Sequence, residues 1–270
     1  IKIGLQGVPP LLLGALRFVL VLFPAIFFIP RPQLPWRWLL AYGLTISLGQ
    51  FAFLFYAMAV GMPAGLASLV LQAQAFLTLL FAVPLLGERV RAGQWLGLLV
   101  AAAGLTLIGL QSGQGMTLAG FALTLCAAAM WALGNIVSRR IGRVDILGLV
   151  IWGALVPPLP FLALSLWLEG PATLERALLG LDLTSLLAIA YLAFAATMLG
   201  YGLWGRLLSR YPASQVAPFS LLVPVVGLSA SALLLGERLD TQQGAGVGLV
   251  LAGLLVNLYG ARLPARAPAR

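Results

Sequence analysis

The stretch "LLGER" stands at Leu85–Arg89 and again, 149 residues later, at Leu234–Arg238. The match continues beyond the pentapeptide, because residues 85–105 and 234–254 agree at ten of 21 positions without a gap. Upstream, Pro63–Ala64 and Pro212–Ala213 fall at the same offset. The chain therefore contains an internal repeat, and its architecture follows from that repeat.

The composition is that of a membrane protein. Apolar residues make up 61% of the chain and charged residues only 9%, against about 25% charged in soluble domains. A helix needs about 20 apolar residues to cross a bilayer. The charge-free intervals reach or exceed this length, and they are Trp38–Gly87, Ala92–Ser138, Ile146–Leu168, Leu183–Gly205, Tyr211–Gly236 and Thr241–Ala261.

These intervals predict nine complete membrane spans. The first two intervals hold two spans each, the other four hold one each, and a ninth span runs from about Leu11 to Ile29. The opening residues, Ile1–Gly4, read as the last turn of a helix that is only partly present. We therefore expect ten transmembrane helices in the intact protein, with no signal peptide.

The positive charges predict the orientation. If the intact N-terminus is cytoplasmic, twelve of the sixteen Lys and Arg residues fall in cytoplasmic segments and three fall outside. This is the arrangement that the positive-inside rule favours. The net charge of +9 then reflects topology and contact with anionic lipid, and it does not indicate nucleic-acid binding. Both termini are expected on the cytoplasmic side of a bacterial inner membrane.

The two LLGER stretches then lie on opposite sides of the membrane. Five spans separate them, and because this number is odd, the second half is inserted upside down, as in many secondary transporters. The predicted boundaries are residues 1–115 for the first repeat, 116–263 for the second and 264–270 for a basic tail. A simpler account of the motif is a tight turn, in which Gly87 and Gly236 end one helix and Glu88 and Glu237 favour the start of the next.

The whole chain resembles the ten-helix EamA branch of the drug/metabolite transporter superfamily. The resemblance rests on "GALRF" at Gly14–Phe18, "LLGER" after spans 4 and 9, Pro-Ala at the start of both spans, and "WALGNIVSRR" at Trp131–Arg140. In detail it is similar to aromatic amino-acid exporters of the YddG type. The resemblance implies an all-α fold of two inverted five-helix repeats around a central cavity. The chain departs from the pattern at Ala75, where relatives often have proline.

Polar and aromatic residues inside the spans are the candidate substrate ligands, since such groups are costly in lipid. Trp131 and Asn135 stand four residues apart on one helix face, and the alternative for Asn135 is a hydrogen bond between helices. The full set of candidate substrate-binding residues is Trp131, Asn135, Gln50, Tyr56, Ser68, Gln72, Tyr201 and Trp204. Gln74 lies on another face and ranks lower.

Three further features carry expectations about helix shape and packing. Pro218 and Pro224 are predicted to kink span 9 as a hinge beside the pathway, because proline removes helix hydrogen bonds. Gly93-x3-Gly97 and Gly244-x3-Gly248 are expected to let helices approach closely within one chain, which favours a monomer over a dimer. Arg17 is expected to snorkel to the outer edge of its span.

The residue types that the chain lacks also limit its possible functions. The chain has no histidine, only one cysteine, and no acid well inside a span, so a catalytic site, a metal site or a cofactor is not expected. We expect an exporter of small amphipathic metabolites, chiefly aromatic or hydrophobic amino acids, that works by alternating access as a facilitative carrier. The alternatives are a multidrug or nucleoside-type effluxer, and a membrane scaffold that does not transport.

Overall fold

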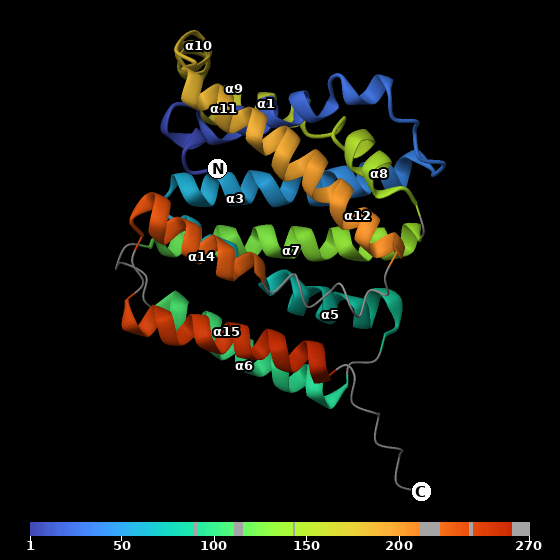
Figure 1. Cartoon of the computed structure of the whole chain (residues 1–270), viewed down its shortest axis with the longest axis vertical. Coiled ribbons are helices and arrows are strands. Elements are labelled where there is room, and N and C mark those ends of the chain that lie inside the picture. Colours follow the sequence, from blue (N-terminus) through green and yellow to red (C-terminus); the bar gives the residue numbers. More distant parts are fainter. Residues whose placement is uncertain (89–90, 111–115, 143, 211–221, 238–239, 261–270) are drawn as a thin grey trace, which may run out of the picture.

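The computed structural model describes residues 1–270 except 89–90, 111–115, 143, 211–221, 238–239 and 261–270. Every regular element in the described part of the chain is helical (Figure 1). The first half contains η1 (Gly4–Gln6), α1 (Pro10–Leu22), η2 (Ala25–Phe27), α2 (Trp36–Tyr42), η3 (Gly43–Gly49), α3 (Gln50–Ala59), α4 (Ala64–Val70), α5 (Ala73–Leu86) and α6 (Ala92–Leu110). The second half contains α7 (Leu118–Ile141), α8 (Ile146–Gly153), α9 (Pro158–Leu168), α10 (Pro171–Leu179), α11 (Leu183–Ala190), η4 (Tyr191–Leu199), α12 (Gly200–Arg210), α14 (Leu222–Leu235) and α15 (Thr241–Gly260).

The predicted spans are confirmed as helical segments. Eight segments of the described chain are long and apolar enough to cross a membrane, and α14 is a shorter apolar helix. The eight are Pro10–Phe27, Trp36–Ala59, Ala64–Leu86, Ala92–Leu110, Leu118–Ile141, Ile146–Leu168, Leu183–Trp204 and Thr241–Tyr259. The protein is thus an all-α polytopic membrane protein. Eight of the nine predicted spans are membrane-length helical segments, and in the interval Tyr211–Gly236 the structure describes the helix Leu222–Leu235.

The sequence repeat is also a repeat of helices. Helix α5 begins and ends 149 residues before α14 begins and ends, and α6 begins 149 residues before α15. A π-helical segment, η3, interrupts the span that contains α2 and α3, and a second, η4, occupies the matching stretch between α11 and α12. The π-helical segments are not visible as a sequence pattern, so their common position is independent support for the repeat.

The two Gly-Glu turns lie at opposite ends of the bundle. Glu237 accepts hydrogen bonds from the backbone N–H groups of Ala64 and Gly65, which begin α4, and Glu88 follows the end of α5. Because α4 and α5 together form one span, the two glutamates are separated by its full length. We refer to these as the Glu237 end and the Glu88 end of the bundle.

Both glycines end their helices as predicted, but the prediction for the glutamates is wrong. Gly87 and Gly236 have φ values of 70° and 64°, the left-handed conformation that ends a helix. Glu237, however, caps α4 of the other repeat and not the following helix, α15. Glu88 forms an ion pair with Arg139 at the end of α7. The partners are set by tertiary neighbours, and not by the turn itself.

The two halves interleave. The most extensive helix contacts all join the first half to the second, and they are α6 with α15, α3 with α7, α5 with α7, α4 with α14, and α1 with α9. Figure 1 shows α6 and α15 side by side at one edge of the bundle, with α7 crossing its middle. The largest helix contacts of each half are therefore made with the other half.

Small residues allow α6 and α15 to touch, but one of the two predicted pairs is not at the contact. A Cβ on Gly97 would lie 2.7 Å from the backbone nitrogen of Asn257, and one on Gly253 would lie 2.6 Å from the nitrogen of Ala101. Gly244 and Gly248 face open space. The close approach within one chain is therefore as expected, but in α15 it uses the face of Gly246 and Gly253.

Two spans are each divided into two helices. The span Ile146–Leu168 is divided between α8 and α9, directly before Pro158, and the span Ala64–Leu86 is divided at Leu71–Gln72 without a proline. Pro224 is buried and is the third residue of α14 as the structure describes it. Pro218 lies outside the described residues. A hinge at these two prolines stays a prediction.

Candidate functional site

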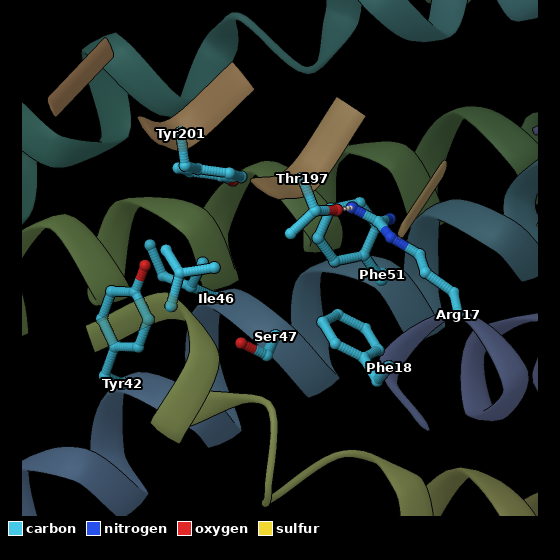
Figure 2. A pocket seen from close by; sticks show the side chains of 9 residues that line it. Arg17, Phe18, Tyr42, Ile46, Ser47, Phe51, Thr197 and Tyr201 are labelled. Carbon is cyan, nitrogen blue, oxygen red and sulfur yellow. Dashed lines mark hydrogen bonds between the residues drawn. The ribbon is translucent and has the colours of Figure 1, made fainter. Parts of the chain in front are cut away.

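Arg17 is buried within the bundle, and the expectation that it snorkels outward is wrong. It is the eighth residue of the span Pro10–Phe27, and 3% of its surface is exposed. Seven residues of helix correspond to about 10 Å, which is too far for the head group to reach the Glu237 end. The side chain points instead toward η4 and α3 (Figure 2).

The guanidinium of Arg17 has one hydrogen bond and a cage of aromatic rings. Its Nη2 donates to Thr197 Oγ1 at 2.8 Å, and its Cζ lies 3.8 Å from the centroid of the Phe51 ring. The rings of Phe18 and Phe55 are within 5.2 and 5.9 Å. Nε and Nη1 are buried and have no hydrogen-bond partner. A charge in this position is held by cation–π attraction on one side and lacks an acceptor on the other.

A small cavity opens beside this guanidinium. Its volume is about 10 Å³, and its lining residues come from both halves and are Arg17, Phe18, Tyr42, Ile46, Ser47, Phe51, Val150, Thr197 and Tyr201. Pockets for drug-sized ligands occupy about 300–1,000 Å³, so a solute of that size requires the helices to move apart. Figure 2 shows the polar groups of Ser47, Thr197 and Arg17 among the aromatic rings.

The two π-helical segments position part of this lining. Ile46 and Ser47 belong to η3, and Thr197 belongs to η4. The Thr197 hydroxyl donates to the carbonyl of Leu192 at 2.7 Å, five residues earlier, and its oxygen accepts from Arg17. π-Helical turns are frequent at functional sites because they displace side chains from the regular helical positions. Here the corresponding segments of the two repeats face the same cavity.

Of the eight residues predicted to contact substrate, Tyr201 lines this cavity. Trp131 packs, partly buried, against the apolar cluster that includes Tyr42 and Ile46. Asn135 Nδ2 donates to Gln74 Oε1 at 2.8 Å and to Thr78 Oγ1 at 3.0 Å, which joins α7 to α5. The amide of Asn135 is thus engaged with protein groups, including the Gln74 that was ranked lower.

The other predicted residues lie outside the cavity lining. Gln50 follows η3 directly, is 2% exposed, and its Oε1 has no partner, whereas Tyr56 is exposed and Trp204 is half-buried. The Ser68 hydroxyl donates to the carbonyl of Gly65. Gln72 is buried at the break between α4 and α5. Substrate contact at these positions stays a prediction.

Most residues of the cavity, and above all Arg17, were not among the predicted substrate ligands. Charged residues inside a span are rare and usually face a bundle interior or a water-filled space, so Arg17 carried a signal that its depth in the span could have revealed. The aromatic residues Phe18, Tyr42 and Phe51 gave no such signal, because phenylalanine and tyrosine occur throughout the apolar spans. Thr197 has no sequence feature that separates it from other threonines.

The arrangement is suited to binding. The nine lining residues supply one fixed positive charge, four hydroxyl groups and aromatic or aliphatic surfaces. No cluster of three or more metal-ligating His, Cys, Asp or Glu side chains occurs in the part of the chain that the structure describes. Once the helices move apart, these side chains could bind an amphipathic solute by burial of its apolar part and by hydrogen bonds to its polar part.

Comparison with known proteins gives one family and two similar relatives. The model of the EamA-like transporter family matches residues 1–110 and 118–259. A "Probable amino-acid metabolite efflux pump" of Salmonella typhimurium is 52% identical over 269 residues, which is 97% of this chain and 90% of that protein. The protein of the same name from Escherichia coli K12 is 52% identical over 268 residues, with the same coverage.

More distant matches agree in fold. An "Uncharacterized transporter" of Archaeoglobus fulgidus is 27% identical over 267 residues, which is 95% of this chain and 91% of that protein. A solved crystal structure superimposes with a TM-score of 0.67 at 21% identity and covers 98% of this chain and 94% of its own. At this identity the structural likeness shows the shared helical fold alone.

Proposed function

The chain belongs to the EamA-like transporter family, and on that premise we propose that it exports small amphipathic metabolites from the bacterial cytoplasm across the inner membrane. The class expected first is aromatic and other hydrophobic amino acids, and the mechanism is facilitated diffusion by alternating access. The observation that carries the proposal is the cavity lined by both repeats around Arg17, near the middle of its span. Midplane sites at a repeat interface are typical of secondary transporters. The names of the two 52% identical relatives support efflux of amino-acid metabolites.

The lining suits an apolar side chain with a polar head. Phe18, Ile46, Phe51 and Val150 supply apolar surface, and burying that surface is worth about 25 cal/mol per Å². The hydroxyls of Tyr42, Ser47 and Tyr201 supply hydrogen bonds at the same site. A solute that combines an aromatic or aliphatic group with charged or polar groups matches this division.

The energy source is proposed to be the solute's own gradient. A carrier driven by protons usually has a titratable carboxylate or imidazole within the membrane. The chain has no histidine, and its seven acids lie outside the eight long spans and α14. Export then follows from a cytoplasmic excess of the metabolite, and the substrate must not strongly prefer one conformation, or it would be trapped there.

The test is counterflow in proteoliposomes. Vesicles loaded with one unlabelled amino acid from a panel should take up a labelled one transiently, with and without an imposed pH gradient. Nucleosides and cationic drugs in the same panel test the alternative effluxer, and a scaffold would move none of these solutes. Uphill accumulation driven by a pH gradient alone and abolished by a protonophore would refute facilitated diffusion. Vesicles without protein give the background.

A further inference from the structure

The guanidinium of Arg17 lacks a counter-charge and two of its hydrogen-bond acceptors. Its side chain is 3% exposed, it donates one bond to Thr197, and Nε and Nη1 remain buried without acceptors. Removing a charge from water costs several kcal/mol unless a counter-charge and hydrogen bonds replace the water. Aromatic faces replace part of this loss through cation–π attraction, but they accept no strong hydrogen bonds. The missing group is therefore an anionic acceptor.

The protein does not supply that acceptor from the cavity. The nine lining residues include no carboxylate, and no acid lies within the described spans. The two carboxylates that contact helix starts of the first half are already engaged, because Glu169 caps the start of α1 and Glu237 caps the start of α4 at the end of the bundle. A buried guanidinium with two unpartnered nitrogens, beside a cavity whose lining holds no carboxylate, indicates that the anionic partner arrives with the solute.

The chemistry of the lining identifies the anion as a carboxylate. Guanidinium groups pair with carboxylates and phosphates through parallel N–H bonds. A dianionic phosphate would need more positive charge than the single cation of this cavity, whereas one carboxylate balances it. The aromatic and aliphatic walls then take the apolar remainder of the solute.

We propose that Arg17 is the carboxylate anchor of this carrier, and that the cavity selects its solutes by their carboxylate and not by an ammonium group. This proposal rests on the proposed function and defines its substrate class as organic monocarboxylates with an apolar part. An ammonium group on the solute meets no counter-charge in the lining and so gains no ion pair there. An amino acid and the same molecule without its amine should therefore bind with similar affinity.

Thr197 is the positioning residue for this anchor. Its oxygen accepts from Arg17 Nη2 while its own hydroxyl hydrogen is directed to the carbonyl of Leu192. The hydroxyl is therefore fixed as an acceptor, and it holds one side of the guanidinium while Nε and Nη1 stay available. Thr197→Val, which keeps the shape of the side chain, should weaken carboxylate binding less than loss of Arg17 does.

The experiment uses three ligands that share one ring: phenylalanine, 3-phenylpropionate, which lacks the amine, and 2-phenylethylamine, which lacks the carboxylate. Binding to the purified protein is measured from the ligand-induced rise in melting temperature, which reports affinity by mass action. The wild type should bind both acids with affinities within about threefold of each other and the amine at least about tenfold more weakly. Loss of one charge-assisted hydrogen bond corresponds to about a tenfold to hundredfold loss of affinity.

Variants at Arg17 separate an anchor from a structural residue. Arg17→Met should bind the two acids at least about tenfold more weakly and lose the preference over the amine. Because it removes an incompletely paired buried charge, it should melt at or above the wild-type temperature without ligand. Arg17→Lys keeps the charge and should retain part of the preference. A lowered melting temperature in both variants, or an unchanged preference in Arg17→Met, would overturn the proposal.

The outcomes also separate this inference from the proposed function. Counterflow by the wild type with equal binding of acids and amine would leave the export function standing and refute the anchor. Binding of the acids that depends on Arg17, without counterflow of any solute, would keep the anchor and refute the carrier. Failure of all three ligands to bind the wild type would overturn the substrate class inferred here.

Discussion

The two copies of the LLGER turn have the same residues, and their glycines have similar φ values of 70° and 64°, but their surroundings differ. Glu88 pairs with Arg139 across a 2.6 Å contact in which the two side chains are 44% and 50% exposed. Glu237 has a side chain only 15% exposed, and it accepts from the N–H groups of Ala64 and Gly65 and from Lys2 Nζ at 2.6–2.9 Å. The first contact is a surface ion pair, and the second is a cap on a helix of the other repeat.

The difference shows that two copies of the same sequence motif can contribute different amounts to the stability of the fold. Exposed ion pairs contribute about 0–1 kcal/mol, because solvent screens them and two long side chains are ordered. Hydrogen bonds from backbone N–H groups to a charged acceptor contribute about 1.5–3 kcal/mol, and a helix N-terminus favours a negative charge. The Glu237 turn should therefore stabilise the fold more than the Glu88 turn does.

Glu169 resembles Glu237 in its role, although it belongs to no repeated motif. Its carboxylate accepts from the N–H groups of Leu11 and Leu12 at the start of α1, and it also accepts from the Ser165 hydroxyl. Carboxylates of the second half thus cap two helices of the first half. At this end of the bundle, helix starts and carboxylates hold the two halves together.

The largest expected difference between the two turns is the side of the membrane on which each lies, and this difference is all or none. Single cysteines at Ala92 and Thr241, in a Cys126→Ala background, should react with an impermeant maleimide from opposite faces of the membrane. These residues begin α6 and α15 at opposite ends of the bundle, and the positive charges predict that Ala92 is cytoplasmic. Labelling of both cysteines from the same side would end the inverted-repeat interpretation.

Glu237→Gln should lower the free energy of unfolding by about 2 kcal/mol, because the charged acceptor for two helix N–H groups and Lys2 is lost. In a protein of this size that corresponds to a fall in melting temperature of about 4–8 °C. Glu88→Gln is the matched control and should change the melting temperature by less than about 2 °C. Equal shifts in the two variants would show that the two turns are energetically equivalent.

Glu169→Gln should cost about 1 kcal/mol, less than Glu237→Gln. The carboxylate of Glu169 caps α1, but it forms no ion pair among the described contacts, and the amide keeps one acceptor oxygen for the helix. The measurement is the same thermal melt, read beside the other two variants. A shift as small as that of Glu88→Gln would limit the capping effect to Glu237.

The pH dependence of stability should report the same difference on a smaller scale. Burial alone would raise the pKa of Glu237, but hydrogen bonds from Lys2, Gly65 and Ala64 hold this pKa below its ordinary value of 4.5. A carboxylate with a lowered pKa stabilises the fold at pH values above its ordinary pKa, and this contribution is lost as the pH falls through the lowered value. The stability advantage of the wild type over Glu237→Gln should therefore be constant near neutral pH and shrink below about pH 4.5. A stability advantage of the wild type that persists unchanged to pH 3 would contradict this prediction.

Much of the architecture could be predicted because a bilayer restricts the choices. Long charge-free intervals have to be helices in lipid, so the spans followed from where charges such as Arg37 and Glu88 stand. The duplicated turn gave the inverted arrangement from the number of spans between Gly87 and Gly236. Boundaries within spans were harder, since the break at Leu71–Gln72 has no proline to mark it.

The site was less predictable, because contact partners depend on which helix faces pack together. Asn135 was a reasonable candidate ligand. Its amide, however, is hydrogen-bonded to Gln74 and Thr78 of α5, a helix that packs against α7. Arg17 had a visible charge, but the acceptor Thr197 is 180 residues away in the sequence. Neither arrangement leaves a pattern within one helix.

The sequence by itself determined what the bilayer and the backbone dictate locally. It set the class of protein, the position of the spans, the duplication, and the helix ends at Gly87 and Gly236, because these depend on runs of apolar residues and on the backbone freedom of glycine. Only the tertiary structure decided that Glu237 caps a distant helix while Glu88 pairs at the surface, and that Arg17 faces a cavity between the halves. The physical reason is that hydrogen bonds and burial depend on distances between helices, and these are fixed only when the two repeats pack together.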